Sequence, residues 1–458
     1  MRNISNRTLL AWFALISIAA FCLNAAAQSH ITGTLPDGAT YVIDVPAKWN
    51  GTLLLYSHGI AWGPNPARNA TDPLAHGYLL RHGYALAGSS YATIGWAVHE
   101  AIPDQIATLD VFASLFGTPI QTIAWGHSMG GLITAGLVQR HPDRFAAALP
   151  MCGILGGSVG WVNTTLDSAF TFNTLIAGGT YEVVNITNPD QDYAIAQADL
   201  TAAQESPQGQ ARIALIAAMY DTPDWADPTS PEPAPTDYVT WEANQFPVVL
   251  GALGDLPYFR LDLEARAGGN PSWNTGVNYA TQLKRSEDNA EVQALYAAAG
   301  LSLDADLATL RNAARIASDP GAEKYLSENI ILNGQISIPV LTLHTTDDPV
   351  VPVEDEQAYA AVVRKAGNQS LLRQRFIHRA GHCQFTPAEM IAGFETLFSR
   401  MATGEWTGLS PSTLNAEATA LGPKYNVLRL NGQWVPMAAA YEKFQSPPFL
   451  RPFDAFSH

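Results

Sequence analysis

Short apolar runs alternate with segments of helical periodicity over residues 31–151 and again over residues 338–401. The runs are rich in aliphatic residues and are bounded by glycine, proline and aspartate, a pattern typical of buried strands. The predicted strands are 31–35, 39–45, 51–57, 83–88, 121–125, 145–151, 338–344 and 371–378. The predicted helices are 102–116, 129–140, 353–365 and 387–401. This alternation predicts an α/β fold with a mostly parallel sheet covered by helices.

The segment 153–335 follows a different pattern, because it combines many aromatic residues with a proline-rich stretch at 223–235. Its predicted helices are 208–219, 291–299 and 307–318. The segment is too long for a loop of a compact domain, so we predict an inserted, mainly helical cap or lid subdomain. The core would then consist of residues 28–152 and 336–403. Residues 404–458 show weak periodicity and are predicted to form a C-terminal extension packed on this core.

The first residues read as an export signal. Residues 1–7 carry two arginines and no acid, residues 9–23 are predominantly apolar, and Ala25, Ala26 and Ala27 offer the small residues of a cleavage site. We therefore predict a signal peptide over residues 1–27 and a secreted or periplasmic protein with no membrane anchor after cleavage. The alternative is an uncleaved N-terminal anchor, although the apolar run is short for a bilayer span.

Composition and charge narrow the range of partners. The 458 residues are 47% hydrophobic and 14% charged, which is typical of a globular protein, and the formal net charge is −16 at pH 7. An acidic surface repels phosphate backbones and anionic lipids, which argues against nucleic acid or a membrane surface as partner. The oligomeric state stays unknown from the sequence.

A candidate nucleophile lies directly after the predicted strand 121–125, in the segment Gly126-His127-Ser128-Met129-Gly130. A serine on a tight strand-to-helix turn presents its hydroxyl above the sheet edge, and the crowded turn requires small residues two positions before and after it. Gly126 and Gly130 meet that requirement. The helix that follows directs its N-terminal amides toward developing negative charge.

The strand 51–57 ends in His58-Gly59, and the loop after it is a candidate for binding an oxyanion. In a site of this kind the residue after the nucleophile gives one backbone N–H and this loop gives the other. Met129 and Ile60 are the predicted donors, although Gly59 is close enough to replace Ile60. His58 is predicted to brace the loop rather than to react.

Candidates for the acid and the base follow the strands 338–344 and 371–378. Asp348 lies four residues after His344, where a triad acid is expected, and the neighbouring Asp347 is the alternative, interpreted as a turn-capping or solvent-facing carboxylate. His382 follows Gly381 on a predicted loop and is favoured as the base over His378. A metal site formed by His378 and His382 is a weaker alternative, because no matching ligand motif accompanies them.

The order Ser128, Asp348, His382, together with His58-Gly59, resembles the α/β-hydrolase superfamily and more loosely its secreted bacterial serine esterases. The resemblance covers residues 31–152 and 338–401. It implies hydrolysis of a small-molecule or polymeric carboxylic ester through an acyl-enzyme, with no cofactor and no metal. A serine peptidase or aminopeptidase of the same fold is the alternative. One departure is Thr345, where a glycine is usual after the strand.

Two further expectations follow from the resemblance. Cys152 and Cys383 are placed beside the nucleophile and base, and export favours their oxidation, so we predict a disulfide between them. Two buried free thiols are the alternative. The cap is expected to line an acyl pocket with aromatic side chains such as Trp161, Phe170, Phe172 and Phe259, although each of these could instead belong to the core of the cap.

Overall fold

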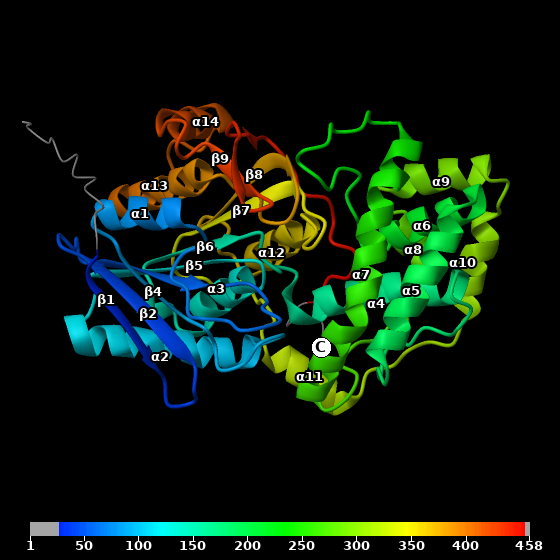
Figure 1. The fold of residues 1–458 in the computed structure, drawn as a ribbon, viewed down its shortest axis with the longest axis horizontal. Helices are drawn as coiled ribbons and strands as arrows, with labels where there is room; N and C mark the ends of the chain where they lie inside the picture. The colour runs from blue at the N-terminus through cyan, green and yellow to red at the C-terminus, as the bar shows by residue number, and fades with distance from the viewer. Residues whose placement is uncertain (1–26, 454–458) are drawn as a thin grey trace, which may run out of the picture.

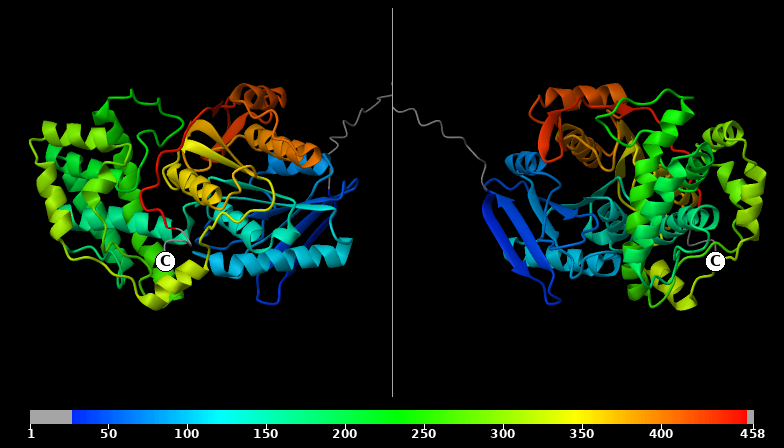
Figure 2. Two further views of the ribbon diagram at one scale, coloured as in Figure 1. Left: turned by 180° about the vertical axis from the view of Figure 1, so that it is seen from behind. Right: turned by 45° about the vertical axis from the view of Figure 1, so that its right-hand side comes forward.

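The structure, a computed structural model, describes residues 27–453 of the chain (Figure 1). The predicted signal peptide lies outside the described residues, except for Ala27, which begins the first strand. Figures 1 and 2 show two lobes, one built on a β-sheet and one built from helices, with the end of the described chain running back between them. Within the described residues, no helix is both long enough and apolar enough to cross a bilayer.

Nine strands form the sheet in the order β1-β2-β4-β3-β5-β6-β7-β8-β11. Neighbours from β4 to β8 are parallel, while β1, β2 and β11 pair antiparallel at the two edges. The strands are β1 (Ala27–Thr34), β2 (Thr40–Pro46), β3 (Thr52–Ser57), β4 (Ala85–Ser89), β5 (Gln121–His127), β6 (Ala147–Met151), β7 (Val340–Asp347), β8 (Leu372–Ala380) and β11 (Tyr441–Glu442). This mostly parallel sheet confirms the predicted fold.

Helices cover both faces of the sheet, which explains why its central strands are apolar throughout. All five residues of β6 are buried, as expected for a parallel strand with a helix layer on each side. One face carries α2 (Val98–Phe116), α3 (Met129–Arg140) and α12 (Glu354–Lys365). The other face carries α1 (Pro73–Arg81), α13 (Pro387–Thr403) and α14 (Pro411–Ala420). A short 3₁₀ turn, Pro142–Arg144, separates α3 from β6.

Local sequence signals fix where two of these helices begin. At α13 the Thr386 hydroxyl accepts a hydrogen bond from the Glu389 N–H, and the Glu389 carboxylate accepts one from the Thr386 N–H. At α1 the Asp72 carboxylate accepts from the N–H groups of Leu74 and Ala75. Asp72-Pro73 is a recognisable helix start in the sequence, but α1 has nine residues and is not among the predicted helices.

The second lobe consists of helices with a hydrophobic core of their own, and we use the term cap for residues 153–335. The core of the cap surrounds α6, in which Ile213, Leu215 and Ile216 are fully buried. The helices are α4 (Gly157–Leu175), α5 (Pro189–Gln204), α6 (Pro207–Ala218), α7 (Tyr238–Ala267), α8 (Tyr279–Leu283), α9 (Asn289–Ala298), α10 (Leu303–Asn312) and α11 (Pro320–Glu328). The predicted helix 307–318 was placed too late, since α10 ends at Asn312.

Residues 404–453 pack on both lobes. After α14, β9 (Val427–Leu430) and β10 (Gln433–Pro436) form a separate hairpin, and β11 then joins the edge of the main sheet. Phe449 is buried against α4, where a methyl group on Gly160 would come within 2.9 Å of its ring. Further on, the Arg451 guanidinium forms an ion pair of 2.6 Å with the buried Asp167 carboxylate of α4. The extension therefore ties the cap to the core.

Candidate active site

Ser128 lies on the turn between β5 and α3, with a backbone φ of 58°. This left-handed conformation is strained for a residue with a side chain, and it presents the hydroxyl at the end of the sheet. The turn is crowded, because a methyl group on Gly126 would come within 2.5 Å of the Ser57 carbonyl oxygen. A methyl group on Gly130 would collide with the same oxygen. The glycines of the motif are therefore required by the packing.

Three side chains separated in sequence form one hydrogen-bonded series at this turn. The Ser128 Oγ lies 2.9 Å from His382 Nε2. The other ring nitrogen, Nδ1, lies 2.9 and 2.8 Å from the two carboxylate oxygens of Asp348. The Asp348 carboxylate is fully buried, whereas the His382 side chain is 23% exposed. The structure thus brings together the three residues that the sequence predicts as nucleophile, base and acid.

Asp348 is held by the turn that follows β7. Its Oδ1 accepts hydrogen bonds from the N–H groups of Val350 and Val351 at 2.9 and 3.0 Å. Burial acts to raise the pKa of Asp348, but the charge and hydrogen bonds of His382 outweigh it and lower this pKa below its usual value. The carboxylate is therefore ionised and able to orient the imidazole.

Asp347 occupies a different environment, as the last residue of β7. Its Oδ2 accepts a hydrogen bond from the Thr346 hydroxyl at 2.7 Å, and no bond joins it to His382 among residues 27–453. Burial raises the pKa of Asp347 to about 7. β7 extends three residues beyond the predicted end at His344, so Asp347 ends this strand rather than capping a turn, and its side chain is partly buried.

The His382 loop is fixed from β7. The Gly381 N–H donates to the Asp347 carbonyl oxygen at 2.9 Å, and the buried Thr345 hydroxyl donates to the Gly381 carbonyl oxygen at the same distance. Thr345 stands where a glycine is usual in the superfamily that the sequence resembles. Its hydroxyl helps to hold the His382 loop through the bond to Gly381. His378, the competing histidine, instead pairs with Glu232 at 3.0 Å on the surface.

The predicted oxyanion donors lie around Ser128. Gly59 approaches so closely that a methyl group on it would be 3.0 Å from Ser128 Cβ. The N–H groups of Ile60 and Met129 make no hydrogen bond within the described residues. Met129 begins α3, so its N–H also lies at the positive end of the helix dipole. Two free donors at a nucleophile are suited to stabilise an oxyanion.

Two histidines flank the nucleophile turn: His58 is buried, and His127 is partly buried at the cavity that contains Ser128. His58 Nδ1 donates to the Gly59 carbonyl oxygen at 2.6 Å, while Nε2 accepts from the Asn65 amide at 2.9 Å. His127 Nδ1 lies 2.7 Å from the Tyr56 hydroxyl. Burial lowers the pKa of His58, and it lowers that of His127 to about 3, so both rings are neutral. His58 thus braces the loop, as the sequence suggested.

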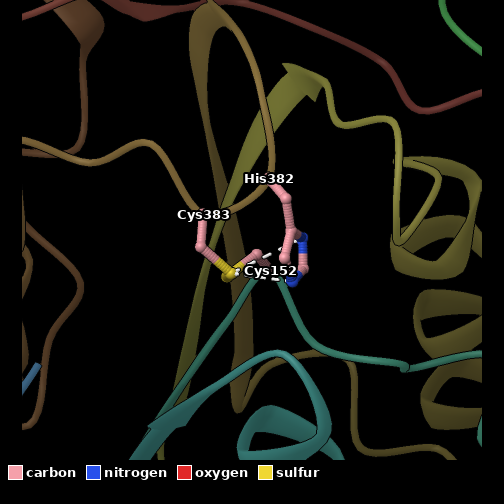
Figure 3. A group of neighbouring side chains, drawn as sticks. All are labelled: Cys152, His382 and Cys383. Carbon is pink, nitrogen blue, oxygen red and sulfur yellow. Dashed lines mark hydrogen bonds between the residues drawn. A yellow bond between two sulfur atoms is a disulfide. The ribbon is translucent and has the colours of Figure 1, made fainter. Parts of the chain in front are cut away.

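A disulfide joins Cys152, directly after β6, to Cys383, directly after His382 (Figure 3). Both residues have positive φ values, 40° and 55°, and their Cα atoms are 5.4 Å apart. The Cys383 sulfur lies 3.4 Å from His382 Nε2. The two cysteines and His382 form a compact group, but oxidised sulfurs offer no thiolate to a metal. The bridge therefore anchors the His382 loop to the strand beside the nucleophile.

We expect the double substitution Cys152→Ser and Cys383→Ser to lower the free energy of unfolding by about 2–5 kcal/mol, because it releases a constraint across 231 positions. The loosened His382 loop should also lower kcat by about 10- to 100-fold. Thermal unfolding and ester kinetics measure both effects, and wild type treated with dithiothreitol should match the variant. Two free thiols in denatured, unreduced protein cleaved after Ala27 would contradict the bridge.

Two cavities meet at the site. The first, of about 520 Å³, contains Ser128 and His382 and is bounded by side chains of α13 and of the β9–β10 hairpin. The second, of about 780 Å³, lies between the cap and the core and is mainly apolar. Ile60, Trp62 and Val350 line both. A substrate at Ser128 therefore has two directions in which to extend.

Of the four aromatic residues expected to line a pocket, two do so. Trp161 of α4 and Phe259 of α7 line the second cavity, with their ring centroids 5.4 Å apart. Phe170 and Phe172 face the other way into the core of the cap, so their assignment to a pocket was wrong. All four lie on helices that the sequence pattern did not resolve, and the direction of each side chain depends on helix phase.

The β9–β10 hairpin is the part of the site that sequence reasoning missed. It places Arg429 and Trp434 in the wall of the first cavity. The signal was Asn431-Gly432 between two short apolar-polar segments, which is typical of a tight hairpin, and both residues have positive φ.

The sheet topology and the position of the serine on the β5–α3 turn define the class as an α/β-hydrolase. The sequence is 30% identical over 446 residues to o-phthalyl amidase from Xanthobacter agilis, with 88% of this chain and 94% of that protein covered. The chain belongs to the family of this amidase and is a serine hydrolase. A model of the prolyl oligopeptidase family also matches residues 90–207, a segment that contains Ser128.

Solved structures with similar folds are more distant in sequence. An esterase from Aspergillus oryzae is 13% identical, with 92% of this chain and 88% of that chain covered and a TM-score of 0.43. An acylaminoacyl peptidase from Pyrococcus horikoshii is 10% identical, with 77% of this chain covered and a TM-score of 0.36. The chain covers 37% of the length of that peptidase.

Proposed function

We propose that this protein is an acyl hydrolase in which Ser128 attacks the substrate carbonyl while His382 accepts the serine proton. The observation that carries the proposal is the unbroken hydrogen-bonded series from Ser128 through His382 to Asp348. The N–H groups of Met129 and Ile60 stabilise the oxyanion, and the alcohol or amine then leaves with the proton that His382 took from Ser128. Water, deprotonated by His382, attacks the acyl-enzyme, and the acid leaves as Ser128 regains its proton. Every step uses groups of this chain, so the proposal includes neither a cofactor nor a metal.

We infer that the acyl group is aromatic and that its amides are substrates together with its esters. The relative that is 30% identical is, by its name, an amidase that acts on the o-phthalyl group. Around Ser128 the side chains of Met151, Phe385 and Met390 supply apolar surface for a ring. An amide and an ester of one acid form the same acyl-enzyme, so the ester expected from the sequence is part of this proposal.

Matched substrates test this assignment. Phenyl esters and anilides of benzoic acid and of phthalic acid differ in one feature at a time. Hexanoyl analogues supply a non-aromatic acyl group, and aminoacyl anilides supply a peptidase substrate. We expect hydrolysis of both bond types, with a preference for the aromatic acyl groups. Cleavage of esters alone would favour an esterase, and cleavage confined to aminoacyl anilides would favour a peptidase. A fluorophosphonate should label Ser128, and absence of labelling would contradict the mechanism.

The peptidase alternative requires a carboxylate that binds a substrate amine, and Asp255 of α7 is the cap carboxylate that lines the second cavity. The proline-rich stretch of the cap carries three carboxylates, Asp224, Asp227 and Glu232, and none of them lines either cavity. Asp227 instead caps its own turn by accepting from Thr229, and Glu232 pairs with His378. The match to the prolyl oligopeptidase family keeps aminoacyl anilides in the test.

We also propose that the protein acts in the periplasm or outside the cell, after cleavage following Ala27. The disulfide between Cys152 and Cys383 supports this proposal, because oxidising compartments preserve such bonds. N-terminal sequencing of the protein from the culture medium and from the periplasm would test the cleavage site, and an intact Met1 in a membrane fraction would contradict it.

The second cavity should bind the part of the substrate on one side of the scissile bond and so determine which substrates are preferred. We expect Trp161→Ala and Phe259→Ala to change the relative kcat/KM among bulky and small substrates by about 10-fold or more, since each removes apolar wall. Phe170→Leu is the matched control, because Phe170 lies in the core of the cap and should affect Tm alone. Unchanged selectivity in both cavity variants would show that substrates do not enter this space.

A further inference from the structure

The β9–β10 hairpin presents one cation and one aromatic ring to the cavity at Ser128. Arg429 and Trp434 are directly opposite each other in the antiparallel pair, so their side chains share one face of the hairpin. Leu428, the neighbour of Arg429, lies on the opposite face and is 1% exposed. The buried leucine thus holds the hairpin against the body while Arg429 and Trp434 line the cavity.

Arg429 lacks a counter-ion in the described part of the chain. Neither an ion pair nor a hydrogen bond reaches its side chain from residues 27–453. Asp72 is the one carboxylate among the residues that line this cavity, and it is engaged at the start of α1 by the N–H groups of Leu74 and Ala75. Arg429 is exposed and lines the cavity that contains Ser128, so its guanidinium can meet an anion that enters this cavity.

The neighbouring groups suit an anion attached to a ring. A guanidinium binds a carboxylate through two parallel hydrogen bonds, and an indole beside it offers a flat apolar surface for an aromatic ring. Phe385 and Met390 add apolar surface on the α13 side of the cavity. An o-phthalyl group, which the relative's name contains, has two carbonyl carbons on adjacent ring carbons, so its monoamide bears a free carboxylate ortho to the acyl group.

We propose that Arg429 and Trp434 form an anion subsite that binds a carboxylate borne by the aromatic acyl group of the substrate. This proposal rests on the proposed function and names its substrate class as monoamides and monoesters of aromatic dicarboxylic acids. Arg429 pairs with the free carboxylate and Trp434 packs against the ring, which positions the second carbonyl for attack by Ser128. Neither residue takes part in bond breaking, so both act as specificity determinants.

The test compares phthalic acid monoanilide with benzanilide, and the matching phenyl esters, in wild type and in Arg429→Gln. We expect the ratio of kcat/KM for the carboxylate substrate to that for the neutral one to fall by on the order of 10- to 100-fold, mainly through KM. Arg429→Lys should restore part of the ratio, since it keeps the charge but loses the paired hydrogen bonds. Added salt should raise KM for the carboxylate substrate in wild type and have little effect in Arg429→Gln.

Lys424→Gln is the matched control, because it removes the same charge from an exposed position that does not line the cavity. It should leave the ratio unchanged. An unchanged ratio in Arg429→Gln would overturn the proposal and make Arg429 an ordinary surface residue. Equal losses for carboxylate and neutral substrates would overturn it as well, because they would indicate a structural role.

A binding measurement separates failure of this proposal from failure of the proposed function. Phthalate should slow fluorophosphonate labelling of Ser128 in wild type at concentrations about 10-fold or more below those needed for benzoate. Arg429→Gln should abolish this difference. Equal protection by phthalate and benzoate in wild type would overturn the subsite even if neither anilide is hydrolysed. Absence of hydrolysis together with selective protection by phthalate would contradict the proposed reaction alone.

Discussion

Replacement of Ser128 by alanine is expected to lower kcat by on the order of 10⁴- to 10⁶-fold for every ester and amide substrate. In the proposed mechanism the Oγ forms the acyl bond, and alanine would leave the N–H groups of Met129 and Ile60 as the remaining contribution to catalysis. The fold should persist, because alanine keeps the backbone at a φ of 58° and loses one contact with a partly exposed imidazole. Tm should therefore stay within about 4 °C of wild type.

The measurement requires purified protein that is free of contaminating esterases, with fluorophosphonate labelling to count active serines. Ser114→Ala is a matched control, since Ser114 is exposed on α2 and its hydroxyl donates to the Val111 carbonyl oxygen within the same helix. Full labelling and activity are expected there. Retention of most activity in Ser128→Ala would mean that another residue is the nucleophile, and the assignments of His382 and Asp348 would fall with it.

The sheet lobe was predictable because its strands and helices carry strong local signals. The residues of α3 were predicted without error, since the motif before it and His141 after it mark both ends. β6 is apolar along its whole length because helices cover both faces of the sheet, and such a run is easily recognised. β7 was predicted to end too early, because Thr345, Thr346 and Asp347 are polar although they continue the strand.

The cap was predictable as an insertion and much less so as a set of helices. The longest of them, α7, contains Pro247 and Pro257, which normally indicate that a helix ends. Helix α4 is buried along nearly its whole length, so its sequence lacks the polar face that produces helical periodicity. Tertiary packing, rather than local preference, determines both segments, and for that reason the direction of Phe170 could not be deduced.

Site residues at the ends of the parallel strands could be predicted from the sequence, whereas those of the C-terminal extension could not. Ser128, Asp348 and His382 each follow a strand of the parallel sheet, and the carboxyl ends of such strands meet at one edge. Cys152 and Cys383 flank the same edge, which is why their pairing could be proposed. Arg429 belongs to a hairpin outside the sheet, and no rule of topology places such a hairpin over the nucleophile.

Asp348→Asn should lower kcat by about 10⁴-fold, whereas Asp347→Asn should lower it by less than about 10-fold. Of the two aspartates, Asp348 alone contacts His382 Nδ1, and an amide there would no longer stabilise the imidazolium or fix the tautomer of the ring. Asp347 bonds to Thr346 instead. Burial raises the pKa of Asp347 to about 7, so asparagine replaces a carboxyl that is already largely neutral below that pH.

The dependence of stability on pH should separate the two variants further. A raised pKa in the fold means that the contribution of Asp347 to stability is complete below its unfolded pKa and is lost as the pH rises through about 7. Asp347→Asn should therefore gain in Tm relative to wild type as the pH rises from about 4 to about 7, and the gain should persist above that pH. The pKa of Asp348 is lowered, so its contribution is present above the unfolded pKa and disappears in acid, and Asp348→Asn should lose most relative to wild type at neutral pH. Kinetics and thermal unfolding over this range decide the assignment, because a larger catalytic loss in Asp347→Asn would transfer the role of the acid to Asp347.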